Sequence, residues 1–305
     1  MENIHASVRA DARDYFLSRS IKWHHWRGES TPSNRPTDHI CCSQSSCVNT
    51  WFPYMNQPQL LAQVLSELGY PVETVLPFES DRAAGPHNFD KREGQPHYVC
   101  FEWIGERNYL QELKFGRVAP DMSRTRGEGF TSADFAFRFK TTDGQVQVVL
   151  GEWKYTEEYA VGAKKQIARS GTDRLRDIYG KSLDRPDCQI QLDVATPQEA
   201  LFYDPFDQLM RLQLLASAME REGELDADIV SVLHVAPKAN TELENRITSP
   251  HLDGRSNDIH DLWNGLVKEG RFIGCHTEDL LPVIAKHAPD RSWLKYMTLR
   301  YGGMR

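Results

Sequence analysis

The chain has 305 residues, of which 40% are hydrophobic and 26% are charged, and this composition excludes a disordered or fibrous protein. Its net charge of -7 argues against a protein that coats nucleic acid by overall attraction, because phosphate binding relies on clustered lysine and arginine. No stretch approaches the roughly 20 apolar residues that span a bilayer, and the cysteines lack the spacing of a disulfide framework. We therefore expect a cytoplasmic protein with reduced thiols and no membrane partner.

Residues 1–40 are predicted to form an N-terminal extension, with a short helix followed by irregular structure rich in histidine, tryptophan, serine and proline. Residues 41–305 are expected to form one domain, because no linker rich in glycine, serine or proline divides them. His39, Cys41, Cys42 and Cys47 lack the paired spacing that is typical of zinc sites, so metal binding there is the weaker interpretation.

The first regular elements precede a basic segment. Apolar residues recur at helical spacing over Gln57–Gly69 and predict an amphipathic helix that the glycine ends. A short strand over Val72–Leu76, a polar loop over Glu79–Gln95 and a strand over Tyr98–Ile104 are expected to follow. The segment Lys114–Arg126 then carries four basic residues against one acid.

A β-hairpin is the strongest local signal in the chain. Residues Ala133–Phe139 and Val146–Lys154 are both strand-like, and the Asp143-Gly144 pair between them favours a tight turn. Apolar residues on one face of these strands are expected to anchor the hairpin in a core, namely Phe135, Phe137, Phe139, Val149 and Trp153.

The pairing of the two strands brings three charged residues together. If the turn is centred on Asp143, Asp134 lies directly across from Glu152. A two-residue turn would shift the pairing by one position, but both acids would still lie at the open end of the hairpin. Lys154 shares the face of Glu152, because side chains two apart on a strand point the same way.

Two carboxylates and a lysine beside apolar neighbours are costly unless something neutralises them. A divalent cation would do so, since Mg²⁺ accepts oxygen ligands from carboxylates, water and a backbone carbonyl such as that of Trp153. The metal would polarise a phosphate and lower the pKa of bound water, while Lys154 would orient or deprotonate that water. The alternative is an exposed charged stripe or an ordinary salt bridge.

Further elements are expected after the hairpin. Acids precede bases over Glu157–Arg169, which predicts a helix, and a second short helix is expected to end at Gly180. The segment Pro205–Arg221 predicts a strong helix, and Ile229–Val235 predicts a buried strand behind it. Two or three helices are expected to close the chain.

Basic residues also gather after the hairpin. Residues 161–185 hold seven basic side chains against three acids, whereas residues 199–228 hold eight acids against two bases. This asymmetry favours a local phosphate-binding face, for which the candidates are Lys164, Lys165, Arg169, Arg174 and Arg176. Solvated helix faces explain the same charges equally well.

Two strings in the chain resemble a known motif. Ser132-Ala133-Asp134, followed by Glu152-Trp153-Lys154, resembles the motif of the PD-(D/E)xK nuclease superfamily, with Ser132 where the motif's name has proline. The longer string over residues 151–157 is similar to that of a bacterial group of restriction endonucleases with an EWKYTE-like motif. Residues 43–49 and 203–211 resemble the same group, so the resemblance spans most of the chain from about residue 41 onward.

This resemblance implies an α/β fold with a restriction-endonuclease-like αβββαβ core, in which helices flank a mixed central sheet. A helical insertion over residues 155–200 and C-terminal helices would be added to that core. Asp134, Glu152 and the Trp153 carbonyl would bind the metal, and Lys154 would be the catalytic lysine. Other residues could act at the site, although surface or packing roles explain each equally well: Glu67, Glu102, Glu112, Gln208 and Arg211.

The implied function is that of an endonuclease that hydrolyses phosphodiester bonds with Mg²⁺, for which Mn²⁺ can substitute. Nucleic acid is the expected partner, with DNA in restriction, defence or DNA processing as the expected substrate. A non-catalytic nucleic-acid-binding or scaffolding module that retains the fold is the alternative, and a protein without any nucleic-acid role is a third. The sequence is also compatible with a homodimer.

Overall fold

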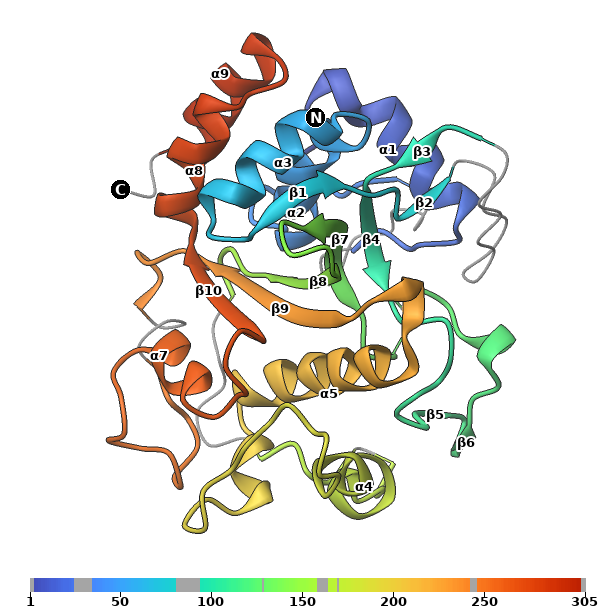
Figure 1. The fold of residues 1–305 in the computed structure, drawn as a ribbon, viewed down its shortest axis with the longest axis vertical. Coiled ribbons are helices and arrows are strands. Elements are labelled where there is room, and N and C mark those ends of the chain that lie inside the picture. The colour runs from blue at the N-terminus through green and yellow to red at the C-terminus, as the bar shows by residue number, and fades with distance from the viewer. Residues whose placement is uncertain are drawn as a thin grey trace.

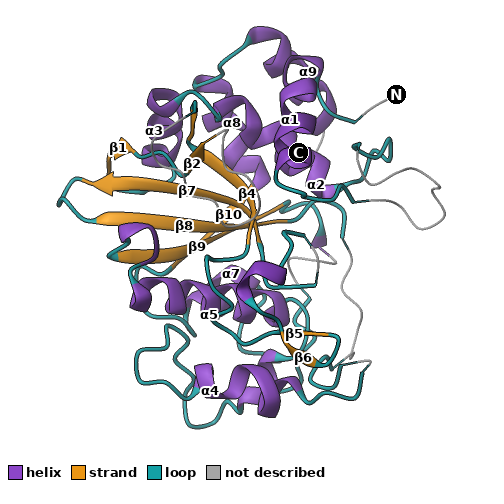
Figure 2. Ribbon diagram, turned by 90° about the vertical axis from the view of Figure 1, so that its right-hand side faces the viewer, coloured by secondary structure: helices purple, strands orange, loops and turns teal. Residues whose placement is uncertain are grey.

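The computed structural model describes residues 3–24, 35–80, 94–127, 129–157, 164–168, 170–241 and 246–302. A six-stranded sheet lies between two layers of helices (Figures 1 and 2). One face is covered by α1 (Ala6–Ser18), α2 (Ser43–Trp51), α3 (Pro58–Glu67), α8 (Thr277–Lys286) and α9 (Arg291–Tyr301). The other face is covered by α5 (Phe206–Glu222) and α7 (Ile259–Asn264). The predicted α/β fold, a mixed sheet flanked by helices, is confirmed.

The sheet is built around β7 (Ala133–Thr141). One edge of β7 pairs antiparallel with β8 (Val146–Trp153). Its other edge pairs antiparallel with β1 (Val72–Val75) at one end and with β4 (Val99–Trp103) at the other. Beyond β8, the sheet continues with two parallel strands, β9 (Ile229–Ala236) and β10 (Phe272–His276). The predicted order of helix, three strands, helix and strand is present as α3, β4, β7, β8, α5 and β9.

The two helices with the clearest sequence patterns are confirmed. The helix predicted over Gln57–Gly69 is α3, which begins at Pro58 and stops before Gly69, whose φ of 93° only glycine adopts readily. The helix predicted over Pro205–Arg221 is α5, and the left-handed Gly223 ends it. Both helices bury an apolar face against the sheet, which is where most helix stability in proteins originates.

Two hydrophobic cores join the layers. The first lies between the sheet and the layer of α1, α2, α3, α8 and α9, and the second lies between the sheet and α5 and α7. The apolar residues predicted to anchor the hairpin all belong to the first core, as expected: Phe135, Phe137, Phe139, Val149 and Trp153. Val148 and Leu150 alternate with them and belong to the second core. The hairpin is therefore fixed on both faces.

The N-terminal residues take part in the first core. Val8, Ala12 and Phe16 of α1 are buried there, and the ring of Phe16 stacks on Trp23 at a centroid distance of 4.0 Å. Behind α1, Glu79 is buried and pairs with Arg19 and Arg126, each at 3.0 Å. These contacts hold the helix predicted for the N-terminal extension firmly against the strands.

The helix predicted over Glu157–Arg169 is wrong for the residues that the structure describes. Residues 164–168 are not helical, and Ile167 forms a β-bridge with Asp173, while residues 158–163 and 169 lie outside the described part of the chain. Acids before bases suit a helix dipole, but Ile167, within the described residues 164–168, is 58% exposed and so contributes no buried apolar face that would hold a helix. The second short helix is present, but it does not end at Gly180, because a π-helical segment over Leu175–Tyr179 continues into α4 (Gly180–Leu183).

Two elements of the central sheet and its helical layers escaped the sequence analysis, as did the short strand pairs of Glu79–Ser80 with Pro96–His97 and of Leu113–Lys114 with Arg117–Val118. Helix α2 is rich in serine, glutamine, asparagine and threonine, and all its residues from Gln44 to Trp51 are buried. Such a sequence has no amphipathic pattern, because α2 is enclosed on every side. Strand β10 is short and is stabilised by its parallel pairing with β9, which a local pattern does not show.

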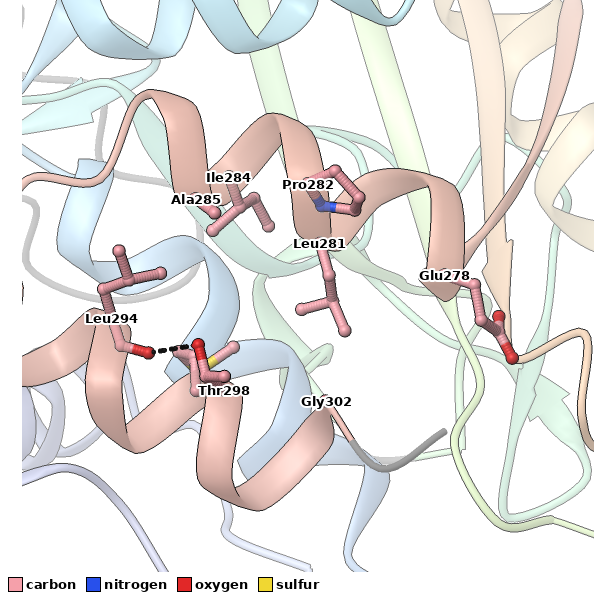
Figure 3. A pocket seen from close by; sticks show the side chains of 9 residues that line it. Glu278, Leu281, Pro282, Ile284, Ala285, Leu294, Thr298 and Gly302 are labelled. Atoms are coloured by element: carbon pink, nitrogen blue, oxygen red, sulfur yellow. Dashed lines mark hydrogen bonds between the residues drawn. The ribbon is translucent and has the colours of Figure 1, made fainter. Parts of the chain in front are cut away.

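None of the described helices is long and apolar enough to cross a membrane. All six cysteines are free. A shallow pocket of about 230 Å³ lies between α8 and α9, and Figure 3 shows Leu281, Ile284 and Leu294 on its walls. It contains none of the predicted site residues.

A buried carboxylate connects the end of α5 to the strand β4. Glu224 Oε1 accepts a hydrogen bond from Trp103 Nε1, and Oε2 accepts one from the backbone N–H of Glu106, both at 2.9 Å. Burial raises the pKa of Glu224 from 4.5 to about 7. The stabilisation from the protonated, buried group is therefore present below pH 4.5 and is lost as the pH rises toward 7.

We expect the free energy of unfolding to fall by about 3 kcal/mol through this carboxyl group over that pH range. Urea unfolding at about pH 5 and about pH 8 measures the effect. Glu224→Gln cannot ionise, so its free energy of unfolding should differ less between the two pH values. Glu222→Gln, at an exposed position nearby, should show the same difference as the unchanged protein. The same pH dependence in Glu224→Gln and the unchanged protein would contradict the assignment.

Candidate active site

The predicted register of the hairpin is confirmed, and it places the two acids side by side. Phe135 pairs with Gly151, and the pairing continues in step to Lys140 and Val146. The next position toward the open end therefore sets Asp134 of β7 beside Glu152 of β8. Both carboxylates line one cavity of about 260 Å³ at the end of the sheet.

Asp134 is held by the backbone of the neighbouring strand. Its Oδ2 accepts a hydrogen bond from the N–H of Trp153 at 2.7 Å. Burial raises the pKa of Asp134 well above its ordinary value, and the carboxylates of Glu152 and Glu102 raise it further. The ionised form of Asp134 is therefore disfavoured as long as no cation lies beside it.

Lys154 and Glu152 form a buried ion pair. Lys154 Nζ lies 2.6 Å from Glu152 Oε1, and the two side chains are only 8% and 9% exposed. The backbone N–H of Lys154 donates to the carbonyl of Val235 in β9, which fixes the end of β8. The ammonium group is thus positioned at the same strand end as the two carboxylates.

Glu102 brings a third carboxylate to the cavity. It lies in β4 between Phe101, which pairs with Phe135, and Trp103, which pairs with Ala133, so it flanks Asp134 on the side away from Glu152. Its φ of 53° is unusual within a strand and turns the residue out of the regular ladder. Glu102 Oε1 accepts from Gln44 Nε2 and Oε2 accepts from Ser132 Oγ, each at 3.0 Å.

Glu112 supports the segment that leads into β7. Its carboxylate accepts hydrogen bonds from the N–H and hydroxyl of Thr131, at 2.8 and 2.7 Å, and from the hydroxyl of Tyr179 at 2.9 Å. Arg211 donates to the Thr131 hydroxyl at 3.0 Å and lies 3.7 Å from Glu112. Glu112 is therefore engaged in holding the chain just before Asp134.

The other predicted site residues divide between two places. Gln208 and Arg211, one turn apart on α5, both line the cavity with Asp134 and Glu152. Glu67 does not, since it pairs with Lys286 at 2.6 Å and with His287 at 2.5 Å, at the end of α3 beside α8.

The predicted basic face is only partly assembled. Lys165 pairs with Asp204, Arg174 with Asp207, and Arg176 with the adjacent Asp177. Lys164 is exposed, and Arg169 lies outside the described residues. Several of these positive charges are thus committed to partners inside the protein, which leaves Lys164 as the best placed for an external phosphate.

A histidine that the sequence analysis missed extends the row of acids. His234 of β9 pairs in register with Glu152, is fully buried, and lies 2.8 Å from His260, Nδ1 to Nε2. Its Nε2 has no hydrogen-bond partner among the described residues. Burial lowers the pKa of His234 well below its usual value, and His260 and Lys154 act in the same direction, so the ring is neutral. A single histidine inside an apolar strand carries no local signal of such a position.

The residues present fit a divalent cation. Glu102, Asp134 and Glu152 bring three carboxylates to one cavity, against the ammonium of Lys154 and the guanidinium of Arg211. Among the described residues, no three His, Cys, Asp or Glu side chains converge closely enough to hold an ion by themselves. Asp134 and Glu152, with the Trp153 carbonyl and water, would supply the sparse oxygen ligand set that Mg²⁺ accepts.

Gly151 keeps the two acid-bearing strands in contact, because the ring of Phe135 lies where a side chain at position 151 would be. We expect Gly151→Ala to lower the free energy of unfolding by about 1–3 kcal/mol through overpacking and to reduce activity by shifting Glu152. Denaturant unfolding measures the loss. Gly151→Ala combined with Phe135→Leu should recover part of it.

Gly265→Ala is the matched control for this prediction. A methyl group at position 265 would meet its nearest neighbour, the carbonyl oxygen of Leu262, at an ordinary 3.5 Å. Stability should change by less than about 0.5 kcal/mol. Equal effects of the two glycine substitutions would show that the Phe135 ring does not restrict position 151.

A model of the family described as Restriction Endonuclease associating with ARP (REase-ARP) matches residues 1–302. The match covers every described helix and strand, from α1 to α9. No curated protein and no solved structure matches the chain.

Proposed function

The chain belongs to the family Restriction Endonuclease associating with ARP, and from this premise we propose that it hydrolyses phosphodiester bonds of DNA with Mg²⁺ at Asp134, Glu152 and Lys154. The proposed site is of the PD-(D/E)xK type. The observation that carries it is the row of Glu102, Asp134 and Glu152 beside the buried ammonium of Lys154. Such a concentration of carboxylates is costly in an apo protein and is expected where a cation binds.

Each residue has a role that follows from its contacts. Asp134 and Glu152 would hold the cation, and Asp134 is oriented for this by the N–H of Trp153. When bound, Mg²⁺ would supply electrophilic stabilisation of the scissile phosphate and a more acidic water. Lys154 Nζ, kept at the site by Glu152, can donate a hydrogen bond to a phosphate oxygen or to the attacking water. Glu102 would hold further ordered water at the edge of the cavity.

Arg211 gives the cavity its positive wall. It lies on α5 and lines the cavity with the acids. Its Nε donates a hydrogen bond to the hydroxyl of Thr131, which orients the guanidinium toward the segment before β7. Gln208 lines the same wall one turn earlier. These donors suit a phosphate that approaches Asp134 from the α5 side, because arginine and amide groups are common phosphate contacts.

The test is incubation of the purified protein with plasmid, linear DNA and RNA, in Mg²⁺, Mn²⁺ or EDTA. Cleavage of DNA that depends on the metal and is lost in Lys154→Ala would support the proposal. Binding of DNA without cleavage in any metal would favour the non-catalytic module instead. The absence of both binding and cleavage would reject a nucleic-acid role.

A further inference from the structure

A second cavity opens beside the candidate active site. It has a volume of about 830 Å³, within the range of ligand sites, and shares Gly129 and Arg211 with the cavity of the acids. Its walls come from the β5–β6 hairpin (Leu113–Lys114 and Arg117–Val118) and from residues 164–168 and 170–179. The two cavities therefore adjoin at Arg211, and the second reaches the tip of this hairpin. The hairpin lies beside α5 in Figure 1.

The tip of the hairpin presents an aromatic ring to solvent. Phe115 is 96% exposed and lines the second cavity. Its φ of 53°, followed by 76° at Gly116, places it in the left-handed region at the first central position of the turn. Asparagine, aspartate or glycine ordinarily occupies that position, because a bulky residue is strained there.

Neither the exposure nor the strain of Phe115 is explained by packing. Within the described part of the chain, the ring belongs to no hydrophobic cluster and to no aromatic pair. An exposed ring in a strained conformation is unfavourable in the free protein. A binding partner that covers the ring would offset both costs.

The charges of the cavity indicate an anionic partner. Lys164, Lys165, Arg174 and Arg211 line it, against Glu112 and Asp207. Most of these charges are paired inside the protein: Asp207 with Arg174 at 2.8 Å, and Lys165 with Asp204 at 2.5 Å. Glu112 accepts hydrogen bonds from Thr131 and Tyr179 and lies 3.7 Å from Arg211. Lys164 is exposed, and among the described residues it pairs with no acid, so its ammonium can bind a phosphate. A planar ring beside such cations suits a nucleotide, whose base stacks and whose phosphate is anionic.

We propose that Phe115 stacks on an unpaired base of the nucleic-acid strand that crosses the active site. This inference rests on the proposed function for the identity of the strand. Lys164 and Arg211 would contact its phosphates, and the scissile phosphate would lie at Asp134. The substrate is thus a single strand, or a duplex with an unstacked base next to the scissile bond, rather than an intact duplex.

The test measures binding in EDTA, so that the strand stays intact whether or not the protein is a nuclease. The probe is a single-stranded oligonucleotide with one 2-aminopurine, followed by its fluorescence and anisotropy. Phe115→Ala should bind about 5- to 100-fold more weakly and lose the quenching of the base, because stacking is lost. Phe115→Trp should retain both.

Two further variants separate stacking from folding and from charge, and a third is a control. Phe115→Asn should fold at least as well as the unchanged protein, because asparagine tolerates the left-handed turn, yet bind as weakly as Phe115→Ala. Lys164→Ala should reduce the dependence of binding on salt, whereas Phe115→Ala should not, because it removes no charge. Leu299→Ala, at an exposed apolar position of α9, should bind like the unchanged protein.

The outcomes distinguish this inference from the proposed function. Binding that depends on Phe115, without cleavage in any metal, would support the stacking site and reject the nuclease. Metal-dependent cleavage with equal binding by Phe115→Ala and the unchanged protein would overturn the stacking site alone. Equal affinity of the unchanged protein for a fully paired duplex and a single strand would overturn it too.

Discussion

Asp134→Asn is expected to slow DNA cleavage by at least about 100-fold and to leave the protein as stable as before or more stable. The loss of activity follows from the loss of a charged cation ligand. Stability should not suffer, because burial and the carboxylates of Glu152 and Glu102 already disfavour the ionised form of Asp134, whose pKa they raise. The asparagine oxygen can still accept the hydrogen bond from Trp153.

This combination of effects is unusual for a buried residue and is easy to measure. Cleavage rates in Mg²⁺ and thermal unfolding curves should be recorded on the same preparations. Asp143→Asn, at an exposed position in the turn of the same hairpin, is the matched control and should change neither quantity. If Asp134→Asn unfolded at a much lower temperature, Asp134 would be a structural anchor and not a cation ligand.

Lys154→Met is expected to abolish cleavage and also to destabilise the protein by about 3–5 kcal/mol. Its removal leaves the carboxylate of Glu152 buried without its partner at 2.6 Å. The double variant Glu152→Gln with Lys154→Met should recover much of that stability, because no unpaired charge stays buried. Activity should not return, because both the ligand and the ammonium are missing.

A double-mutant cycle measured by urea unfolding gives the coupling between the two side chains. We expect the double variant to lose less stability than the sum of the losses in the two single variants. Additive effects would mean that the ion pair contributes little to the fold. Cleavage by Lys154→Met at the rate of the unchanged protein would remove Lys154 from the mechanism.

The hairpin shows which features a sequence can predict. Its turn, its register and the face of each side chain follow from a period of two and the Asp143-Gly144 signal, and the structure confirms all three. Helices α3 and α5 were equally predictable, since each has an apolar face and a terminating glycine. These are local patterns, which the tertiary structure supports.

Features set by tertiary contacts could not be predicted. Helix α2 is polar yet enclosed, so its sequence has no helical pattern of apolar residues. The charge order of residues 157–169 favoured a helix, but the described residues there pack as an irregular segment against residues 172–174. The order of charges alone does not stabilise a helix, because most helix stability in proteins comes from burying an apolar face.

The candidate site was partly predictable for the same reason. Asp134, Glu152 and Lys154 lie on one hairpin, so a local argument brings them together. Glu102 and His234 reach the row through long-range pairing of β4 and β9, and Glu102 has a left-handed backbone, which a glutamate in the sequence does not indicate. Glu102 was one of several candidate acids, and Glu67 was another that lies elsewhere.

The most direct test compares plasmid cleavage by the unchanged protein and by Asp134→Asn, each with Mg²⁺ and with EDTA. The unfolding temperatures of both proteins are measured first, to show that both are folded at the assay temperature. The proposal expects cleavage by the unchanged protein in Mg²⁺ and none in the other three reactions. Cleavage by Asp134→Asn at the rate of the unchanged protein, or cleavage by the unchanged protein in EDTA, would contradict a metal-dependent site formed by Asp134 and Glu152.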